Sequence, residues 1–315
     1  MIIYFDFKKL QTQFIKQQNE SNSFAVDFLI DKAQKKDFVG IINDALTNNK
    51  ELLNALKTEK NFVVLPDCVV GFDNLEVPTE NFWSKNKYFD TKFNLLYNAK
   101  NNLIVSKSVY SKDHNKTTYL FATTKKQIVE QIVDTFKRHD VVITGISYFS
   151  LVLNECLTLE KKQFSKTNLL VILNQGGVNL FGYSNGFTLG TKDLNILKNK
   201  ENFAKKYAIL AKNKQNSAVF LNENIENEIK NTKLEKSDFD IKFPKLQWAI
   251  EEFEKTFTES NLKLNFDKIC VINSNDKFVD LDNPKIIAIE NFDLSSALKA
   301  YKSSPFYIQK RRFWK

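Results

Sequence analysis

The order of strand-like and helix-like segments constrains the fold of this chain most strongly, because the order occurs twice. Three strand-like runs with polar residues between them open the chain, "IIYFDF", "LQTQFIKQQ" and "SFAVDFLID", and a helical spacing follows at 41–57. The stretch "LLVILNQGGVNLFGYSNG" at 169–186 reads as a buried strand, a glycine corner and a second strand closed by Asn185 and Gly186. A helical segment at 194–214 comes next. We therefore predict an α/β protein with two halves, each opening on a strand meander.

The segments between these landmarks predict the domain organisation. In the first half we expect strands on both sides of a Pro66-Asp67 break, a helix beginning near Thr79, strands at 102–110 and 117–124, a helix at 125–139, a strand at 141–146 and a helix at 147–157. In the second half we expect a strand at 218–222, a helix at 245–257, strands at 268–273 and 285–290, and a closing helix at 294–301. The predicted domains are 1–160, with an inserted subdomain at about 78–140, and 161–291, followed by a closing helix and a basic aromatic tail at 292–315.

Charge and cysteine usage exclude several classes of protein. The 315 residues carry a net charge of +9, but the 46 basic and 37 acidic residues are mostly interleaved, which favours solvated mixed-charge faces over a nucleic-acid patch. Cys68, Cys156 and Cys270 each lie in an apolar run, so we expect buried core thiols and no disulfide framework. Since no apolar run is long enough for a membrane span, a cytoplasmic protein is expected.

Histidine usage gives no sign of catalysis or zinc binding. His114 lies in a polar turn, and His139 follows Lys137 and Arg138 at the end of a helix, where positive charge meets the carbonyl end of the helix dipole. With only two histidines and no clustered cysteines, a zinc site is not expected.

The order of segments resembles the actin-like ATPase superfamily and, within it, the PilM-type pilus-assembly proteins, which are relatives of FtsA. The resemblance is best at 62–157, where "VVLPDCVVGFDNLEVP" and "YLFATTKKQIVEQIVDTFKRHDVVITGISYFSLVLNECL" stand for the family's strand, Leu-Pro-Asp turn, helix and return helix. Three weaker matches follow the family's order: "YFDFKKLQTQFI" at the first phosphate loop, "LLVILNQGGVNLF" at the second and "KICVINSND" before the adenosine loop. The resemblance implies an actin-like fold of two α/β domains with a small α/β subdomain inserted in the first.

The three nucleotide-binding loops of this family lack most of their characteristic residues in this chain. Asp6 remains in the first loop, but Phe7, Lys8, Lys9 and Leu10 replace the small residues that let backbone N–H groups approach a phosphate. In the second loop Ile172 stands where the family has its metal-holding aspartate, although Gly176 and Gly177 remain. In the third loop Asn273, Ser274 and Asn275 replace glycines. We therefore interpret the chain as a pseudo-ATPase without catalytic or metal-binding residues, with residual ATP binding at Asp6, Gly176 and Gly177 left open.

Two aromatic stretches allow two interpretations each. Phe82, Trp83, Tyr88 and Phe89 either pack the core of the inserted subdomain or line a groove for a partner peptide. The end of the chain combines aromatic and basic residues that either contact an anionic membrane or fold against the domain: Lys310, Arg311, Arg312, Phe313, Trp314 and Lys315.

The resemblance implies a cytoplasmic adaptor at the inner face of the membrane. PilM-like proteins bind the short cytoplasmic N-terminal segment of a PilN-like bitopic membrane protein and so link a type IV pilus or secretion platform to its motor. The alternative is an active actin-like ATPase that binds nucleotide or polymerises. Nucleic-acid binding ranks last because no recognition motif accompanies the charge, and homo-oligomerisation stays open.

Overall fold

The computed structural model describes residues 1–6, 10–16, 23–78, 82–97, 103–161, 167–174, 177–195, 245–257, 265–272, 285–289, 292 and 297–298. The chain divides into two compact units. One unit comprises Met1–Thr167, Gly182–Thr191 and Phe292–Lys315, and the other comprises Asn168–Phe181 and Lys192–Asn291.

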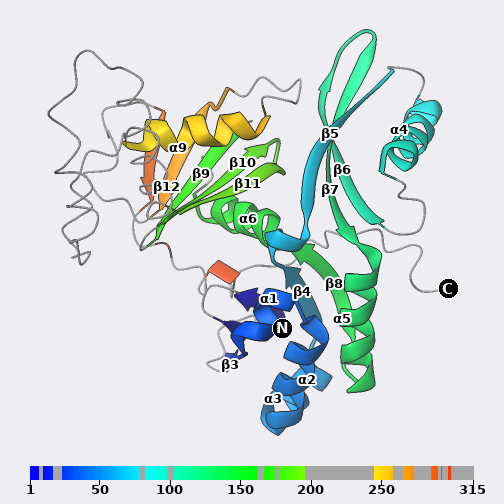
Figure 1. The fold of residues 1–315 in the computed structure, drawn as a ribbon, viewed down its shortest axis with the longest axis vertical. Coiled ribbons are helices and arrows are strands. Elements are labelled where there is room, and N and C mark those ends of the chain that lie inside the picture. The colour runs from blue at the N-terminus through cyan, green and yellow to red at the C-terminus, as the bar shows by residue number, and fades with distance from the viewer. Residues whose placement is uncertain are drawn as a thin grey trace, which may run out of the picture. The chain divides into compact units, whose positions relative to one another are not determined.

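The first unit contains a five-stranded sheet in the order β3-β2-β1-β4-β8, of which Figure 1 labels β3, β4 and β8. Its strands are β1 (Ile2–Asp6), β2 (Gln11–Ile15), β3 (Phe24–Asp27), β4 (Asn61–Leu65) and β8 (Ile143–Tyr148). The first three strands form the predicted antiparallel meander, and β4 and β8 are added in parallel to β1. β4 is buried over its whole length, as its uninterrupted apolar run requires for a central parallel strand.

The helical segment predicted at 41–57 is two helices, because Asn49 interrupts it. After α1 (Ile30–Lys35), α2 covers Phe38–Asn48 and α3 covers Lys50–Thr58. Asn49 is extended and its Oδ1 accepts a hydrogen bond from the Leu52 N–H at 2.9 Å, so it caps α3. An asparagine inside an apolar helical pattern was the signal for this break.

The amphipathic helix predicted at 125–139 is confirmed as α5 (Lys126–Arg138), which packs against α2. Its buried residues include Val129, Ile132 and Phe136. His139 follows the helix, and its Nε2 lies 3.1 Å from Oδ1 of Asn43 on α2.

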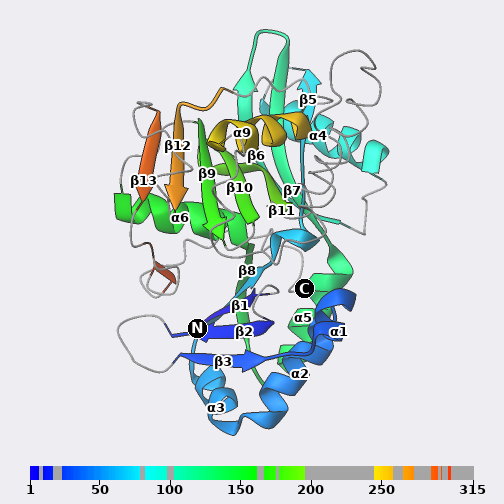
Figure 2. The ribbon, with the colours of Figure 1, turned by 60° about the vertical axis from the view of Figure 1, so that its left-hand side comes forward.

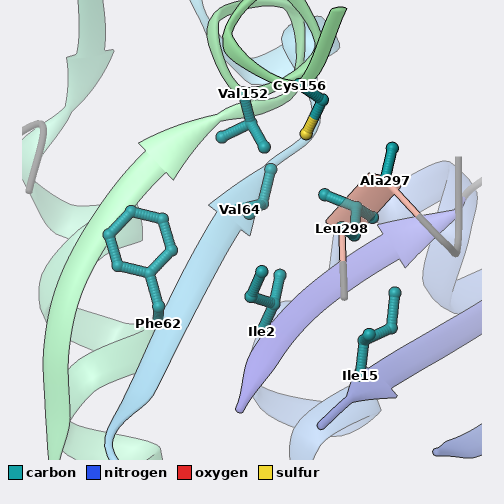
Figure 3. Close-up of a cluster of buried hydrophobic side chains, with 8 residues drawn as sticks. All are labelled: Ile2, Ile15, Phe62, Val64, Val152, Cys156, Ala297 and Leu298. Carbon is teal, nitrogen blue, oxygen red and sulfur yellow. The ribbon is translucent and has the colours of Figure 1, made fainter. Parts of the chain in front are cut away.

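The main core cluster of the first unit unites segments from both ends of the chain. Helix α6 (Phe149–Lys161) contributes Val152 and Cys156, and β4 contributes Phe62 and Val64 (Figure 3). The cluster is completed by Ile2, Ile15, Ala297 and Leu298. Ala297 and Leu298 are the described part of the closing helix, so the end of the chain returns to its first strands.

A smaller three-stranded sheet, β5-β7-β6, carries the helix α4 on one face. It is formed by β5 (Gly71–Pro78), β6 (Leu103–Lys112) and β7 (Lys116–Lys125), with α4 at Phe82–Tyr97 and a 3-10 turn, η1, at Asp67–Val69. Its core contains Leu75, Val77, Phe89, Phe93, Tyr119 and Phe121. The inserted unit thus spans 71–125, whereas α5, which the expected range of 78–140 included, packs on α2.

The second large sheet has the order β11-β10-β9-β12-β13 (Figure 2). Its strands are β9 (Thr167–Asn174), β10 (Gly177–Ser184), β11 (Phe187–Asn195), β12 (Lys268–Ile272) and β13 (Ile286–Ile289). Strand β11 was not among the expected strands, and the prediction of a helix beginning at Leu194 was wrong, because Leu194 lies in this strand. Residues 196–214, and the strand expected at 218–222, lie outside the described residues.

Helix α9 (Lys245–Glu254) and the short η3 turn (Lys255–Phe257) confirm the helical pattern at 245–257. Leu246 and Phe253 are buried, and Phe253 contacts Phe257 and Phe266 through its ring. In the part of the chain that the structure describes, no helix is long and apolar enough to cross a membrane.

Candidate functional site

The first candidate nucleotide corner lies where β1 turns into β2. Asp6 ends β1 and pairs in register with Gln11, the first residue of β2, while residues 7–9 lie outside the described part of the chain. Leu10 has a φ of 54°, in the left-handed region that glycine enters without a steric cost. Its carbonyl accepts a hydrogen bond from the Phe28 N–H at 2.8 Å, which holds this bulky residue in the corner.

The second candidate corner follows β9, which ends with Ile172, Leu173 and Asn174. Ile172 lies near the end of β9 and pairs with Ile272, the last residue of β12. The described strands β9, β12 and β13 contain no aspartate or glutamate. Gly177 begins β10, whereas Gly176 and the third corner at 273–275 lie outside the described residues.

The described residues form no group of three or more histidine, cysteine or acidic side chains that could hold a metal ion. Cys156 and Cys270 are buried as expected, and burial raises the pKa of Cys270 to about 11. Cys68 is exposed, so its prediction as a core residue was wrong: the turn after Pro66 carries it to the surface.

The two large sheets share one topology. In the first sheet a three-stranded antiparallel meander is followed by two parallel strands. In the second sheet β9, β10 and β11 are neighbours joined by two-residue connections, which only antiparallel strands allow, and β12 and β13 are added in parallel. This is the actin-like ATPase fold.

Comparisons with known proteins found similar solved structures at low sequence identity. No protein-family model and no curated protein matches the chain. Among solved structures, the chain is similar to a PilM-PilN type IV pilus biogenesis complex, with 9% identity and a TM-score of 0.48 over 91% of this chain and 87% of that one. It is also similar to the cytoplasmic domain of EpsL, an inner-membrane component of the type II secretion system of Vibrio cholerae, with 10% identity and a TM-score of 0.40 over 67% and 73% of the two chains. A Bacteroides thetaiotaomicron protein with an actin-like ATPase fold and unknown function shows 8% identity and a TM-score of 0.42 over 96% and 95%.

A buried polar cluster, which the sequence did not reveal, lies at the first turn of α6. One carboxylate oxygen of Asp67, Oδ1, accepts hydrogen bonds from the Ser150 backbone N–H at 3.1 Å and from the Ser150 hydroxyl at 3.0 Å. A carboxylate in this position satisfies a free N–H of the helix and is favoured by the helix dipole. The Pro66-Asp67 break therefore serves as more than a turn, because it anchors the start of a helix that lies far along the chain.

The β10–β11 hairpin is held by the same turn of α6. The Tyr183 hydroxyl donates to the Ser150 carbonyl at 2.8 Å, and the Thr188 hydroxyl donates to the Ser150 hydroxyl at 3.2 Å. One turn further along α6, Asn154 donates from Nδ2 to the Gly186 carbonyl at 3.3 Å. Asn185 and Gly186 both have positive φ, 49° and 78°, as a two-residue hairpin turn requires.

Burial keeps the tyrosines of this cluster neutral. The pKa of Tyr183 is raised well above the ordinary 10.0 by desolvation and further by the nearby Asp67 carboxylate. Burial likewise raises the pKa of Tyr148, although the neighbouring Thr188 hydroxyl opposes part of that shift. Both phenols therefore stay protonated near neutral pH.

The four aromatic residues proposed for partner binding do not form one surface. Phe89 is 1% exposed and its ring lies 5.2 Å from Tyr119 and 5.6 Å from Phe93, so it packs the core of the small unit and does not face a partner. Tyr88 is 42% exposed on the adjacent side of α4. Phe82 and Trp83 lie at the start of α4, but their side chains are not among those that the structure describes. The tail at 310–315 also lies outside the described residues.

Side chains occupy backbone hydrogen-bonding groups of β5, an edge strand of the small sheet. The Asn74 N–H donates to Oδ1 of Asp73 at 2.7 Å, and the Glu76 carbonyl accepts from Nζ of Lys92 at 2.7 Å. Pro78 has no N–H to offer. Since these features disfavour pairing with another strand, a peptide that binds the small unit is not expected to extend this sheet at β5.

Proposed function

We propose that this chain is a pseudo-ATPase adaptor or scaffold of a type IV pilus-like or secretion assembly platform. The observation that carries the proposal is the composition of the corners: Leu10 takes the left-handed position of the first turn, and Ile172, near the end of β9, pairs with Ile272 at the end of β12 where the family would have a carboxylate. ATP turnover needs a phosphate cradle and a carboxylate-held metal together. An adaptor needs only the fold, and a fold can be retained after its chemistry is lost.

The proposed partner is the cytoplasmic N-terminal segment of a PilN-like bitopic membrane protein, and the proposed location is the inner face of the cell membrane. This partner class follows from the resemblance of the sequence, and PilM with PilN is the pair on which the proposal is patterned. The start of α4, with Phe82 and Trp83, is the surface that we propose for this contact.

A binding titration tests the adaptor function. The N-terminal peptide of the single-span membrane protein encoded nearest to this chain is titrated against the full chain, with a scrambled peptide as the control. Saturable binding that falls at least tenfold in the double variant Phe82→Ser/Trp83→Ser supports the proposal. If neither this peptide nor that of any other membrane protein of the same machine gives saturable binding, the adaptor function is wrong.

The runner-up function is an active actin-like ATPase, which Asp6 at the end of β1 favours. A nucleotide present at 100 times its dissociation constant stabilises a protein by about 2.7 kcal/mol. We expect Mg-ATP to leave the melting temperature of this chain unchanged. A shift that is lost in Asp6→Asn, together with phosphate release, would establish the runner-up, and a shift without phosphate release would indicate residual binding.

A further inference from the structure

Exposed apolar side chains concentrate on one helix. Among the described residues, the large hydrophobic side chains with substantial exposure are Leu29, Ile30, Tyr88, Leu95, Leu96, Tyr97, Val109 and Val142. Four of these eight belong to α4, and Leu95 is the most exposed of all at 79%. Single exposed apolar residues are ordinary, but a group on one surface indicates contact with another molecule or with lipid.

The helical period places three of these residues, Tyr88, Leu95 and Leu96, on a side of α4 that the small sheet does not cover, whereas the ring of Tyr97 contacts Phe121 of that sheet. Phe89 and Phe93 are spaced by four residues and face the sheet. Tyr88, Leu95 and Leu96 are spaced by seven and eight residues, so they form a second stripe beside the first. We call this stripe, together with Lys92 between its residues, the outer face of α4. The apolar side of α4 therefore includes exposed residues in addition to those that pack against the small sheet.

The charge around the outer face is positive. Asp90 on α4 is paired with Lys107 of β6 at 3.3 Å. Lys87 is exposed, and Lys92 donates to the backbone carbonyl of Glu76, which carries no net charge. Lysine side chains can cover apolar surface with their stems while the ammonium group reaches phosphates.

The same surroundings argue against a peptide as the occupant. An extended peptide would use the adjacent edge of β5, but the Lys92 and Asp73 side chains occupy its backbone groups. A single helix side is convex, and a bilayer interface accepts a convex amphipathic helix without a groove.

We propose that the outer face of α4 rests on an anionic lipid surface, with Leu95 and Leu96 entering the interface and Lys87 and Lys92 meeting lipid phosphates. This inference does not rest on the adaptor function, because a lipid contact needs no protein partner. Contacts of this size bind membranes weakly and reversibly, so a second attachment is expected to act with it.

Vesicle sedimentation of the full chain tests the proposal. The probes are vesicles of phosphatidylglycerol with phosphatidylcholine and vesicles of phosphatidylcholine alone. We expect binding only to the anionic vesicles, a decrease of binding with salt, and a fall of roughly tenfold in the partition coefficient of Leu95→Glu/Leu96→Glu. The matched control is Leu29→Glu/Ile30→Glu, which changes a pair of similar exposure, 67% and 60%, and should bind as the unmodified chain does. Circular dichroism checks that both variants remain folded.

Three outcomes would overturn the proposal. The first is equal binding to neutral and anionic vesicles, or no binding to either. The second is binding that persists in Leu95→Glu/Leu96→Glu but disappears in Lys310→Gln/Arg311→Gln/Arg312→Gln, which would assign the contact to the tail. The third is that the unmodified chain does not bind vesicles, while Leu95→Glu/Leu96→Glu abolishes its self-association or its binding of a partner peptide. That result would make the outer face a protein-docking surface.

Discussion

Single residues of the first sheet illustrate how closely its elements pack. Gly145 on β8 lies under the ring of Phe62, since a Cβ atom at this position would stand 2.7 Å from Cε2 and 2.8 Å from Cδ2 of that ring. Phe62 is 5% exposed and belongs to the main core cluster, so its ring has little room to withdraw. The glycine at this position is therefore required by packing and not by its backbone angles.

We predict that Gly145→Ala destabilises the protein by about 1–3 kcal/mol, because an added methyl group overpacks the core. The matched control is Gly71→Ala, whose added methyl group would meet only the Thr123 hydroxyl, at 3.1 Å. Urea denaturation measures the free energy of unfolding of both variants. Equal losses in the two variants would contradict this account.

The buried tyrosines predict how stability depends on alkaline pH. In the unfolded chain a tyrosine ionises near its ordinary pKa of 10.0, whereas burial raises the pKa of Tyr183 well above that value in the folded protein. The folded state therefore holds its proton longer, and the stabilisation is complete below pH 10 and decreases as the pH rises above 10. We expect Tyr183→Phe to lose about 1 kcal/mol near neutral pH, with the hydrogen bond to the Ser150 carbonyl, and to show a smaller alkaline decrease.

The measurement is the free energy of unfolding of both proteins on either side of pH 10. Parallel pH profiles for Tyr183→Phe and the unmodified chain would show that the folded environment does not hold the Tyr183 proton.

At the scale of elements, α6 connects the first sheet to the β10–β11 hairpin. Its apolar side places Val152 and Cys156 in the main core cluster, whereas its polar residues Ser150 and Asn154 hold the hairpin. Ser150 belongs to the first turn of the helix, and Asp67 binds this turn through two hydrogen bonds.

We predict that Asp67→Ala costs about 1–3 kcal/mol, since it leaves the Ser150 N–H and hydroxyl without their acceptor. Asp67→Asn keeps an acceptor oxygen of the same shape and should cost less. The control is Asp37→Ala at the start of α2, which removes a single cap bond, 2.9 Å from the Gly40 N–H, and should cost about 1 kcal/mol. Thermal and urea unfolding compare the three variants, and an Asp67→Ala loss no larger than that of Asp37→Ala would contradict the anchoring role.

At the scale of the whole molecule, the first unit is assembled from distant parts of the chain. Leu298 is 1% exposed and packs with Ile2 and Ile15 of the first two strands. The unit therefore cannot complete its core until the chain has passed through the second sheet.

We predict that Leu298→Ala lowers the free energy of unfolding by about 2–5 kcal/mol, as large-to-small changes in cores do. The same change at Leu96, which is 60% exposed, should have an effect within about 0.5 kcal/mol. Hydrogen exchange of β1 and β2 reports which part of the molecule is affected. Unchanged protection of these strands in Leu298→Ala would mean that the end of the chain does not stabilise the first sheet.

The sequence by itself determined the elements whose apolar period is strong. The opening meander, the buried strand β4, the amphipathic α5 and the start of β9 were predicted because burial of one face, or of both, leaves a repeating pattern along the chain. The bulky residues of the first corner, and an isoleucine at position 172 in place of a carboxylate, could also be read directly from the sequence. The proposed loss of ATPase chemistry depends on them.

Only the tertiary structure decided which residues meet across the chain. Nothing near Asp67 in sequence indicates Ser150, and nothing near Ile2 indicates Leu298, because hydrogen bonds and core contacts over such separations leave no local period. The turn at Asn185 and Gly186 was recognised, but β11 was not predicted, and its last two residues, Leu194 and Asn195, were assigned to the helical segment expected at 194–214. The exposed side of α4 was hidden for a related reason. Its leucines look like core residues until the small sheet is seen to cover only one stripe of the helix.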